Sequence, residues 1–492
     1  MKEVSRKSGN CPRRKKRHES TPLTDRSNRG PQADIFASMI RREFIAGAAA
    51  GATTALAQGQ RPPNILYIHS HDTGRFIQPY GHAVPTPNLQ KLASAGVLFR
   101  HACDAAPTCS PSRASLLTGM CPHSNGMLGL AHRGFALKDY SQHVLHTLRP
   151  AGYTSALFGV QHVGKSGEQI GYEHVEVFKS GNHAVDVGPA AAKWLRSAPK
   201  LPFFLDIGFQ ETHREFAKPG AGEDERYTMP PAPILDVEQS RRDMAGFKAS
   251  ARLLDNAIGQ VMDALEAAGL AGNTLVISTT DHGVAFPSMK CNLTDHGIGV
   301  YLIMRGPGGF TGGKVSDALV SHLDIFPTIC DVTGVKHPTW LQGHSMLPLM
   351  TGEKQEIREE LFAEVNYHAA YEPKRAVRTQ RWKYIRNFSD RTKPVLPNCD
   401  DGLSKDIWLK YGWKNRPVDQ EQLYDLVFDP NESHNLVADP AHGKVLADMR
   451  ARLDKWMRET NDPALKGEVK APEGAVINDV DGTSPKERTR PA

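Results

Sequence analysis

The stretch from Cys109 to Gly119, which reads Cys-Ser-Pro-Ser-Arg-Ala-Ser-Leu-Leu-Thr-Gly, combines residue types that could do covalent chemistry. Pro111 fixes φ and lacks a backbone donor, so it suits the first turn of a helix. Cys109 is therefore expected at or just before a helix N-terminus, where unpaired N–H groups favour an anion. Arg113, one turn later, can bring a guanidinium to the same point. This combination suits attack on a sulfate or phosphate group, and a buried free cysteine at a turn is the plainer alternative.

The pattern C-x-P-x-R followed by Thr118-Gly119 resembles the signature of the formylglycine-dependent sulfatases, a family of the alkaline phosphatase-like superfamily. The resemblance implies that Cys109 is oxidised to formylglycine by a partner protein, a formylglycine-generating or sulfatase-maturating enzyme. The segment Asn125–Leu130, which reads Asn-Gly-Met-Leu-Gly-Leu, extends the resemblance to the heparan N-sulfatase branch of the family. It covers roughly residues 64–436, most of the chain.

The basic charge of the chain is concentrated in its first 42 residues. The 492 residues carry a formal net charge of +6, with 39% hydrophobic and 23% charged residues, which are values of a globular protein. Residues 1–42 hold twelve Lys or Arg and four Asp or Glu, a net of +8, so the remainder sums to −2. The main part of the chain therefore gives no indication of a nucleic-acid partner.

The N-terminal residues resemble an export signal that follows a basic tail. Residues 1–38 have the composition of a disordered or non-native extension. In residues 39–58, Arg41 and Arg42 precede a short apolar run that ends in Ala55-Leu56-Ala57, which is typical of a Tat signal with its cleavage site. The run is too short to span a bilayer. We therefore expect an exported, periplasmic or secreted protein without stable membrane insertion; an ordinary first helix is the alternative.

The seven cysteines of the chain show no C-x-x-C spacing that would indicate a zinc site. When Cys11 in the tail and Cys109 are set aside, five remain, and at least one of them must be unpaired. One disulfide is compatible with an exported protein, but the sequence indicates no particular pairing.

Four apolar runs that are predicted to form strands are each followed by His or Asp residues. His71-Asp72 follows residues 64–68, and His162 follows residues 153–158. His213 follows residues 202–209, and Asp281-His282 follows residues 274–278. Polar residues at the carboxyl ends of parallel strands are where α/β proteins place their sites, so one shared site is expected.

The order of predicted elements indicates an α/β fold with two parts. Alternating strands and helices predict a doubly wound sheet, and the resemblance implies an alkaline phosphatase-like α/β/α sandwich over residues 62–360. Residues 361–465 are expected to form a smaller C-terminal α+β subdomain with a small antiparallel sheet. Residues 466–492 are polar and rich in Pro and Gly, so a flexible tail is predicted there.

The resemblance also implies a divalent metal site. Asp72, Asp281 and His282 match the metal ligands of the family, with formylglycine at position 109 as a further ligand. The family usually has two adjacent Asp residues where this chain has His71-Asp72. Ca²⁺ prefers oxygen ligands and imidazole suits softer metals, so Ca²⁺ is the first expectation and Mn²⁺ or Zn²⁺ remain open, with His71 either a ligand or a neighbour.

Three further side chains match positions of the family that handle the sulfate group. Lys290 and His213 would hold its oxygens or protonate the leaving group, and His162 would contact the formylglycine. The lysine that the family usually has two residues before this histidine is Val160 here. His71, Arg75 or Arg214 could compensate for the missing charge.

A polar group in the second part of the chain predicts the class of substrate. Glu364, His368 and Arg375 lie in the segment that, in the resemblance, reaches the mouth of the pocket, and their mixture of donors and acceptors suits a sugar. The leading interpretation is thus a sulfatase acting on a sulfated saccharide, as a sulfate ester or sulfamate. A phosphonate monoester or phosphodiester hydrolase and an inactive binder of sulfated polysaccharide are the alternatives. A homo-oligomer is left open.

Overall fold

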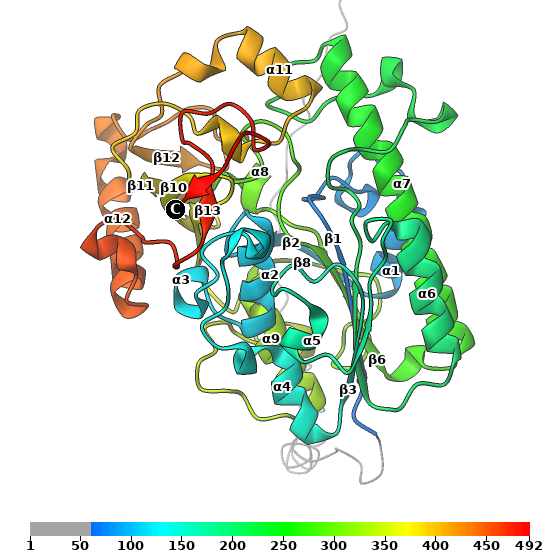
Figure 1. Cartoon of the computed structure of the whole chain (residues 1–492). Coiled ribbons are helices and arrows are strands. Elements are labelled where there is room, and N and C mark those ends of the chain that lie inside the picture. Colours follow the sequence, from blue (N-terminus) through cyan, green and yellow to red (C-terminus); the bar gives the residue numbers. More distant parts are fainter. Residues whose placement is uncertain (1–60) are drawn as a thin grey trace, which may run out of the picture. The chain divides into compact units, whose positions relative to one another are not determined.

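A computed structural model describes residues 61–492 of the chain. The predicted basic tail and export signal, residues 1–38 and 39–58, lie outside the described residues. Figure 1 shows a large twisted sheet covered by helices, with a smaller sheet beside it. Contacts between Cα atoms group residues 61–492 into one compact unit.

The large sheet has eight strands in the order β4-β3-β5-β1-β6-β7-β2-β8. The neighbours β4, β3, β5, β1 and β6 are parallel to one another, and β7 is antiparallel to both β6 and β2. The strand order is therefore that of a doubly wound sheet with one reversed strand. The bounds are β1 Asn64–Ser70, β2 Val97–Cys103, β3 Thr154–Gly159, β4 His174–Glu176, β5 Phe203–Gly208, β6 Thr274–Thr280, β7 Leu302–Arg305 and β8 Lys314–Ser321.

Both faces of this sheet are buried under helices, because successive side chains of a strand point to opposite faces. In β1, Ile65 and Tyr67 belong to one core, with α2, α4 and α9, whereas Leu66 and Ile68 belong to the other, with α1, α6 and α7. This is the predicted three-layer α/β/α arrangement. The helix bounds are α1 Pro87–Ala95, α2 Cys109–Thr118, α3 Pro122–Asn125, α4 Val144–Leu148, α5 Gly167–Ile170, α6 Ala184–Arg196, α7 Glu238–Ala267, α8 Asp295–Ile298, α9 Ile325–Thr333, α10 Leu347–Thr351, α11 Leu403–Lys410 and α12 Gly443–Glu459.

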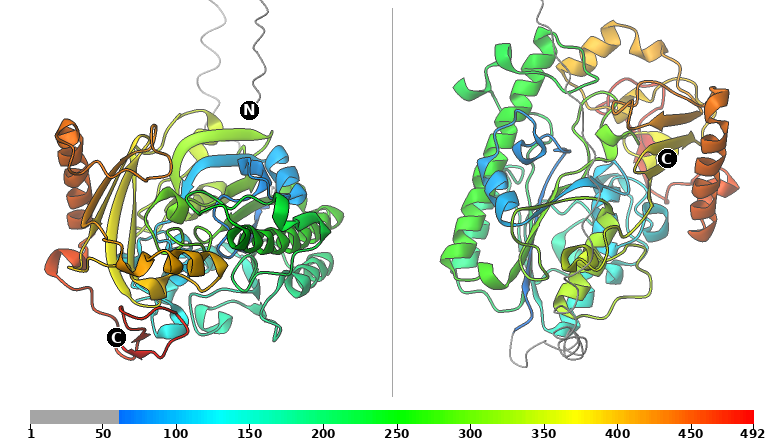
Figure 2. Two further views of the ribbon diagram at one scale, coloured as in Figure 1. Left: turned by 90° about the horizontal axis from the view of Figure 1, so that it is seen from above. Right: turned by 180° about the vertical axis from the view of Figure 1, so that it is seen from behind.

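The small sheet is antiparallel and has the order β12-β11-β10-β9. One of its faces packs on α12 and the other on the large-sheet part, again through alternating side chains such as Val377 and Ala376. Figure 2 shows this sheet and α12 at one side of the large sheet. The strands are β9 Glu360–Tyr367, β10 Tyr371–Thr379, β11 Trp382–Asn387 and β12 Glu421–Asp425.

The C-terminal residues correct the expectation of a flexible tail. Residues 466–492 include the pair β13 (Val476–Ile477) and β14 (Arg490–Pro491), and Ala475 and Ile477 are buried in the core that also contains α2 and α4. The Nη1 of Arg133 donates to the Oδ1 of Asn478 at 2.8 Å. These apolar side chains are isolated between polar ones, so their burial could not be recognised from composition.

All six cysteines within residues 61–492 are buried and free. In the same part of the chain, the helices are too short or too polar to cross a membrane.

Candidate active site

The four strands that end in His or Asp are neighbours in the sheet, in the order β3, β5, β1 and β6. Because they run parallel, the residues after them meet at one edge. His162, His213, Asp72 and Asp281 therefore come together, as the sequence predicted. Helix α2 points its N-terminus, with Cys109 as its first residue, at the same edge (Figure 1).

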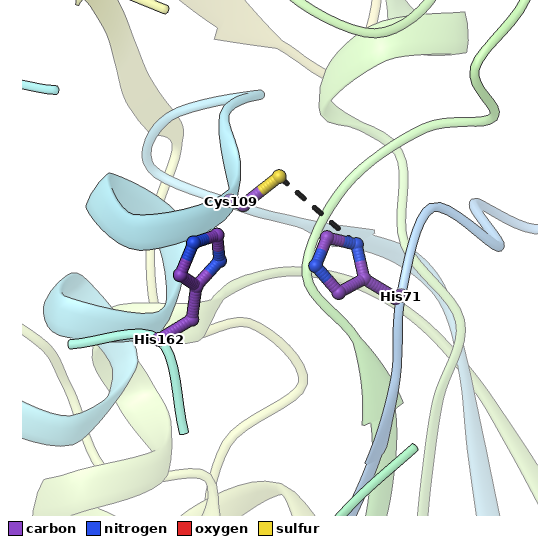
Figure 3. Close-up of side chains that lie close together, drawn as sticks. All are labelled: His71, Cys109 and His162. Atoms are coloured by element: carbon purple, nitrogen blue, oxygen red, sulfur yellow. Dashed lines mark hydrogen bonds between the residues drawn. The ribbon is translucent and has the colours of Figure 1, made fainter. Parts of the chain in front are cut away.

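Cys109 lies among imidazole rings at the bottom of the site. Its Sγ is 3.3 Å from the Nε2 of His282 and 4.0 Å from the Nδ1 of His71. Figure 3 shows that His71 and His162 flank the Cys109 side chain from opposite sides. Burial raises the pKa of the Cys109 thiol well above its ordinary value, so the unmodified side chain is a protonated thiol and a weak nucleophile.

Two buried carboxylates face this point. The Oδ1 of Asp281 accepts from the backbone N–H groups of Asp72 at 2.8 Å and His282 at 3.0 Å, and its Oδ2 accepts from Arg113 at 2.9 Å. The Nδ1 of His71 is 2.9 Å from the Oδ1 of Asp72 and 3.3 Å from the Oδ2 of Asp281. Burial opposes the ionisation of both carboxyls, but nearby cations outweigh it. Lys290 beside Asp72 holds the pKa of that carboxyl well below the usual range. The neighbouring histidines and Arg113 do the same for the pKa of Asp281.

The donor atoms fit a divalent cation. Four donor atoms lie within 4.8 Å of one another: a ring nitrogen of His71, a carboxylate oxygen from each of Asp72 and Asp281, and the Sγ of Cys109. The Sγ stands for the oxygen that an oxidised residue 109 would place there. Burial lowers the pKa of His71 to about 4, so its ring is neutral and can offer a lone pair. The Nδ1 of His282 lies 3.0 Å from the carbonyl oxygen of Gly283, which leaves its Nε2 free to face the site.

Arg113 supports the site from behind and does not line the open pocket. Its Nη1 contacts the Nδ1 of His69 and its Nη2 donates to the carbonyl oxygen of Ser70 at 3.1 Å, in addition to Asp281. The other nitrogen of His69 is 2.9 Å from the Oδ1 of Asp206. Sequence reasoning missed His69 and Asp206, which lie in the buried strands β1 and β5. The sequence of a buried strand does not show whether a polar residue in it orients an arginine or caps a turn.

Lys290 links the two sheets at the site. Its ammonium donates to the Oδ2 of Asp72 at 2.9 Å and to the Oδ2 of Asp400 at 2.8 Å, and these two carboxylates raise its pKa even though burial opposes the charge. Sequence reasoning missed Asp400, which follows the small sheet. His368 is buried close to these groups: burial, then the charge of Lys290, lowers its pKa well below the ordinary value. Arg214, one of the suggested replacements for the missing lysine, is instead paired with Asp243 at 2.7 Å.

A cavity of about 890 Å³ opens from this site. His71, His162 and His213 lie at its inner end, and Val160, Lys165, Asn182 and Gln210 are among the residues around it. The ring of His213 meets that of His71 edge to face, with centroids 4.6 Å apart, and its Nε2 is 3.9 Å from the Oδ2 of Asp72.

Glu364 and Arg375, two of the three predicted substrate contacts, lie in a different place. Both are fully buried in a group that we call the interface cluster, formed by His123, Glu364, Arg375 and Asp462. Arg375 donates to both carboxylate oxygens of Asp462, and Glu364 accepts from the backbone and ring of His123. The prediction that these two residues bind substrate is therefore wrong: their charges are neutralised within the interface between the two sheets.

The fold and the site together define an enzyme that transfers a tetrahedral anionic group, because carboxylates, cations and imidazoles surround the end of a helix that carries a potential nucleophile. The model of the sulfatase family matches residues 63–335, and that of the C-terminal region of N-sulphoglucosamine sulphohydrolase matches residues 289–398. Human N-sulphoglucosamine sulphohydrolase is 30% identical over 85% of this chain and 93% of its own length. The chain therefore belongs to the sulfatase family, and it is a sulfuric ester hydrolase.

Two further similarities agree with this assignment. Delta 4,5-hexuronate-2-O-sulfatase of Bacteroides thetaiotaomicron is 27% identical over 83% of this chain and 91% of its own length. A solved structure in complex with its substrate D-glucosamine-2-N,6-O-disulfate shares the fold, with a TM-score of 0.63 and 19% identity over 83% of this chain and all of that one.

Proposed function

We propose that the protein releases sulfate from a sulfated amino sugar, held as a sulfamate or a sulfate ester, with Cys109 oxidised to formylglycine and one divalent cation beside it. The observation that carries this is the position of Cys109, the first residue of α2, within 4.8 Å of donor atoms of His71, Asp72 and Asp281. The human relative is named for a sulfohydrolase of N-sulfoglucosamine, which supports the amino sugar.

The groups that would hold the cation are Asp72, Asp281 and the oxidised residue 109, with His71 and His282 as nitrogen donors. A divalent cation there would withdraw charge from the sulfate oxygens, and the hydrated aldehyde of formylglycine would supply a hydroxyl as the nucleophile. Arg113 fixes the carboxylate of Asp281 through its 2.9 Å contact.

The remaining residues bind the sulfate and serve the leaving group. The ammonium of Lys290, held between Asp72 and Asp400, can donate to a sulfate oxygen and offset its charge. The Nδ1 of His213 contacts the carbonyl oxygen of Arg214, so its Nε2 faces the cavity and can carry a proton to a departing amine or alcohol. Lys165, Asn182 and Gln210 around the cavity are suited to sugar hydroxyls and an acidic group.

Two measurements test this function. Mass spectrometry of the peptide that contains Cys109 should show a mass lower by about 18 Da than for unmodified Cys. Turnover should be compared among N-sulfated glucosamine, an O-sulfated analogue, and a phosphate ester and a phosphonate ester of the same sugar. Faster turnover of the phosphorus compounds, or full activity of protein with unmodified Cys109, would contradict the proposal.

We also propose that residues 39–58 direct export and that the mature chain begins near Gln58. The support is the twin Arg41-Arg42 and the Ala55-Leu56-Ala57 site. N-terminal sequencing of protein purified from its native source tests this: recovery of residues 1–38 would contradict it.

A further inference from the structure

By the resemblance described above, the family usually has a lysine two residues before His162, where this chain has Val160, and a pair of histidines lines the same cavity. Val160, which occupies the position of that lysine, lies beside the cavity with an apolar side chain. Two residues later, His162 turns its ring toward Cys109 and His71, and its ligand atom lies within 4.8 Å of theirs (Figure 3). The Nε2 of the His162 ring contacts His132.

His132 and His162 are in direct contact through one hydrogen bond. The Nδ1 of His132 is 3.0 Å from the Nε2 of His162, and the two rings are nearly parallel, with centroids 5.2 Å apart at an interplanar angle of 6°. Two ring nitrogens at this distance share a single proton, so one ring donates and the other accepts. The Nδ1 of His162 is buried and has no hydrogen-bond partner within residues 61–492.

The backbone around His132 is held on both sides, while its ring is exposed and is held by its contact with His162. The N–H of Ala131 donates to the Oγ of Ser110, the neighbour of Cys109, at 3.0 Å. Arg133 binds the side chain of Asn478 in the C-terminal segment at 2.8 Å. Gly134 has φ of +94°, and a Cβ there would come within 2.9 Å of the Cα of Ala475. The backbone of His162 is also constrained, with φ of +58°, in the left-handed region that side chains other than Gly rarely occupy.

We propose that His132 is a positioning residue: its Nδ1–H donates to the Nε2 of His162 and holds the proton of His162 on Nδ1, where it faces residue 109. A sulfate group and an oxygen on residue 109 both accept hydrogen bonds. An Nδ1–H supplies the donor that they need, whereas the opposite tautomer would present a lone pair to an anion. The His132–His162 pair in this way supplies a donor that the missing lysine would otherwise provide. The role rests on the proposed function, because it assumes that an anionic group binds beside residue 109.

The first test reads the tautomer without any turnover. Heteronuclear NMR of the histidine side chains in the full chain, with and without inorganic sulfate, distinguishes a proton on Nδ1 from one on Nε2. We expect His162 to carry its proton on Nδ1 in the wild type and to lose this preference in His132→Ala. A wild-type His162 protonated on Nε2 would overturn the inference, whatever substrate the enzyme takes.

The second test uses turnover of an N-sulfated glucosamine. An Asn side chain can place an N–H close to where His132 has its Nδ1–H, and Ala cannot. His132→Ala should lower kcat by about ten- to a hundredfold with a smaller change in KM, as for other residues that orient a functional imidazole. His132→Asn should retain most of the activity. His337→Ala removes a histidine outside the site, which is paired with Asp331, and controls for the loss of an imidazole.

Restoring the lysine provides the third arm. Val160→Lys in the His132→Ala background should recover most of the lost kcat, because the added ammonium supplies the missing donor. Equal losses in His132→Ala and His132→Asn at unchanged thermal stability would show that only the shape of the ring matters and would overturn the inference. Failure of Val160→Lys to restore kcat would overturn the relation to the missing lysine. A wild type without activity on sulfated sugars would count against the proposed function, and the NMR test would still decide the role of His132.

Discussion

Two buried groups of charged residues in this protein have almost the same composition but different surroundings. One group lies beside Cys109 and consists of Asp72, Asp281, His71 and Lys290; we call it the catalytic group after the proposed function. The other is the interface cluster, His123, Glu364, Arg375 and Asp462. Each combines two carboxylates, a histidine and a cation. Three residues of the interface cluster, His123, Glu364 and Asp462, also have the spacing of metal ligands, as the catalytic residues do. Residue type and spacing therefore do not separate the two groups.

The difference lies in how completely each group satisfies its own members. In the interface cluster, Arg375 makes a two-pronged contact with Asp462, and Glu364 accepts from His123, so two cations meet two anions in a closed set. In the catalytic group, Arg113 pairs with Asp281, and Lys290 is shared between Asp72 and Asp400, so two cations face three carboxylates. The Nδ1 of His71 lies between Asp72 and Asp281, and the site opens to a cavity of about 890 Å³. The interface cluster, whose charges are neutralised by one another, stabilises the packing between the two sheets. The catalytic group, whose charges are not fully neutralised and which lies next to a cavity, can bind a ligand.

The largest contrast is expected from the same change, carboxylate to amide, in the two groups. Asp281→Asn removes a charge from the proposed metal site and should lower kcat/KM by about a thousandfold or more, since several kcal/mol of stabilisation are lost. Glu364→Gln should instead lower the free energy of unfolding and leave kcat/KM of the folded protein unchanged. Steady-state kinetics and urea unfolding of both variants measure this, and a similar loss of kcat/KM in both would abolish the distinction.

Metal removal should affect only the catalytic group. After treatment with a chelator, activity should fall by at least about a hundredfold and return with one divalent ion. Recovery with Mn²⁺ or Zn²⁺ but not with Ca²⁺ would identify the nitrogen donors of His71 and His282 as ligands. Full activity in metal-free protein would rule out the proposed cation.

The sequence predicted the fold and the edge of the sheet at which several site residues meet, because both depend on local patterns. Apolar runs that end in Asp72, His162, His213 and Asp281 lie on neighbouring parallel strands, so position within a strand was enough to bring them together. The partners of Arg375 and Lys290 could not be predicted in this way. Asp462 is 87 residues from Arg375 and Asp400 is 110 residues from Lys290, and only tertiary packing reveals such pairs.

Arg375→Ala should mainly affect stability, contrary to the role in sugar binding that the sequence suggested. Its removal leaves the carboxylates of Glu364 and Asp462 buried with only His123 to balance them, so the free energy of unfolding should fall by about 3–5 kcal/mol. Turnover of a sulfated sugar and of a small aryl sulfate should change equally, if at all, when measured below the unfolding temperature. Selective loss of the sugar activity would show that Arg375 reaches the substrate after all.

The smallest expected effect is the pH dependence of the interface cluster. Burial alone would lower the pKa of His123, but Glu364 beside it raises this pKa well above its ordinary value. The pKa in the unfolded chain is about 6.5. The His123–Glu364 contact therefore contributes fully to stability below about pH 6.5, and the contribution is lost as the pH rises through the folded pKa.

Between about pH 7 and 8.5, the difference between the wild type and a variant without the His123–Glu364 pair isolates this contribution, because the other buried groups are common to both proteins. Burial lowers the pKa of His143 and His322 to about 3, so their effect on stability is complete above pH 6.5. Burial raises the pKa of Glu432 to about 7. Its ionisation therefore lowers the free energy of unfolding mainly below pH 7. From pH 7 to 8.5 the free energy of urea unfolding should thus fall by up to about 1.4 kcal/mol per pH unit more in the wild type than in a His123→Asn/Glu364→Gln double variant. Parallel curves for the two proteins would mean that His123 is neutral in the folded state, and the interface cluster would then not be a closed set of two cations and two anions.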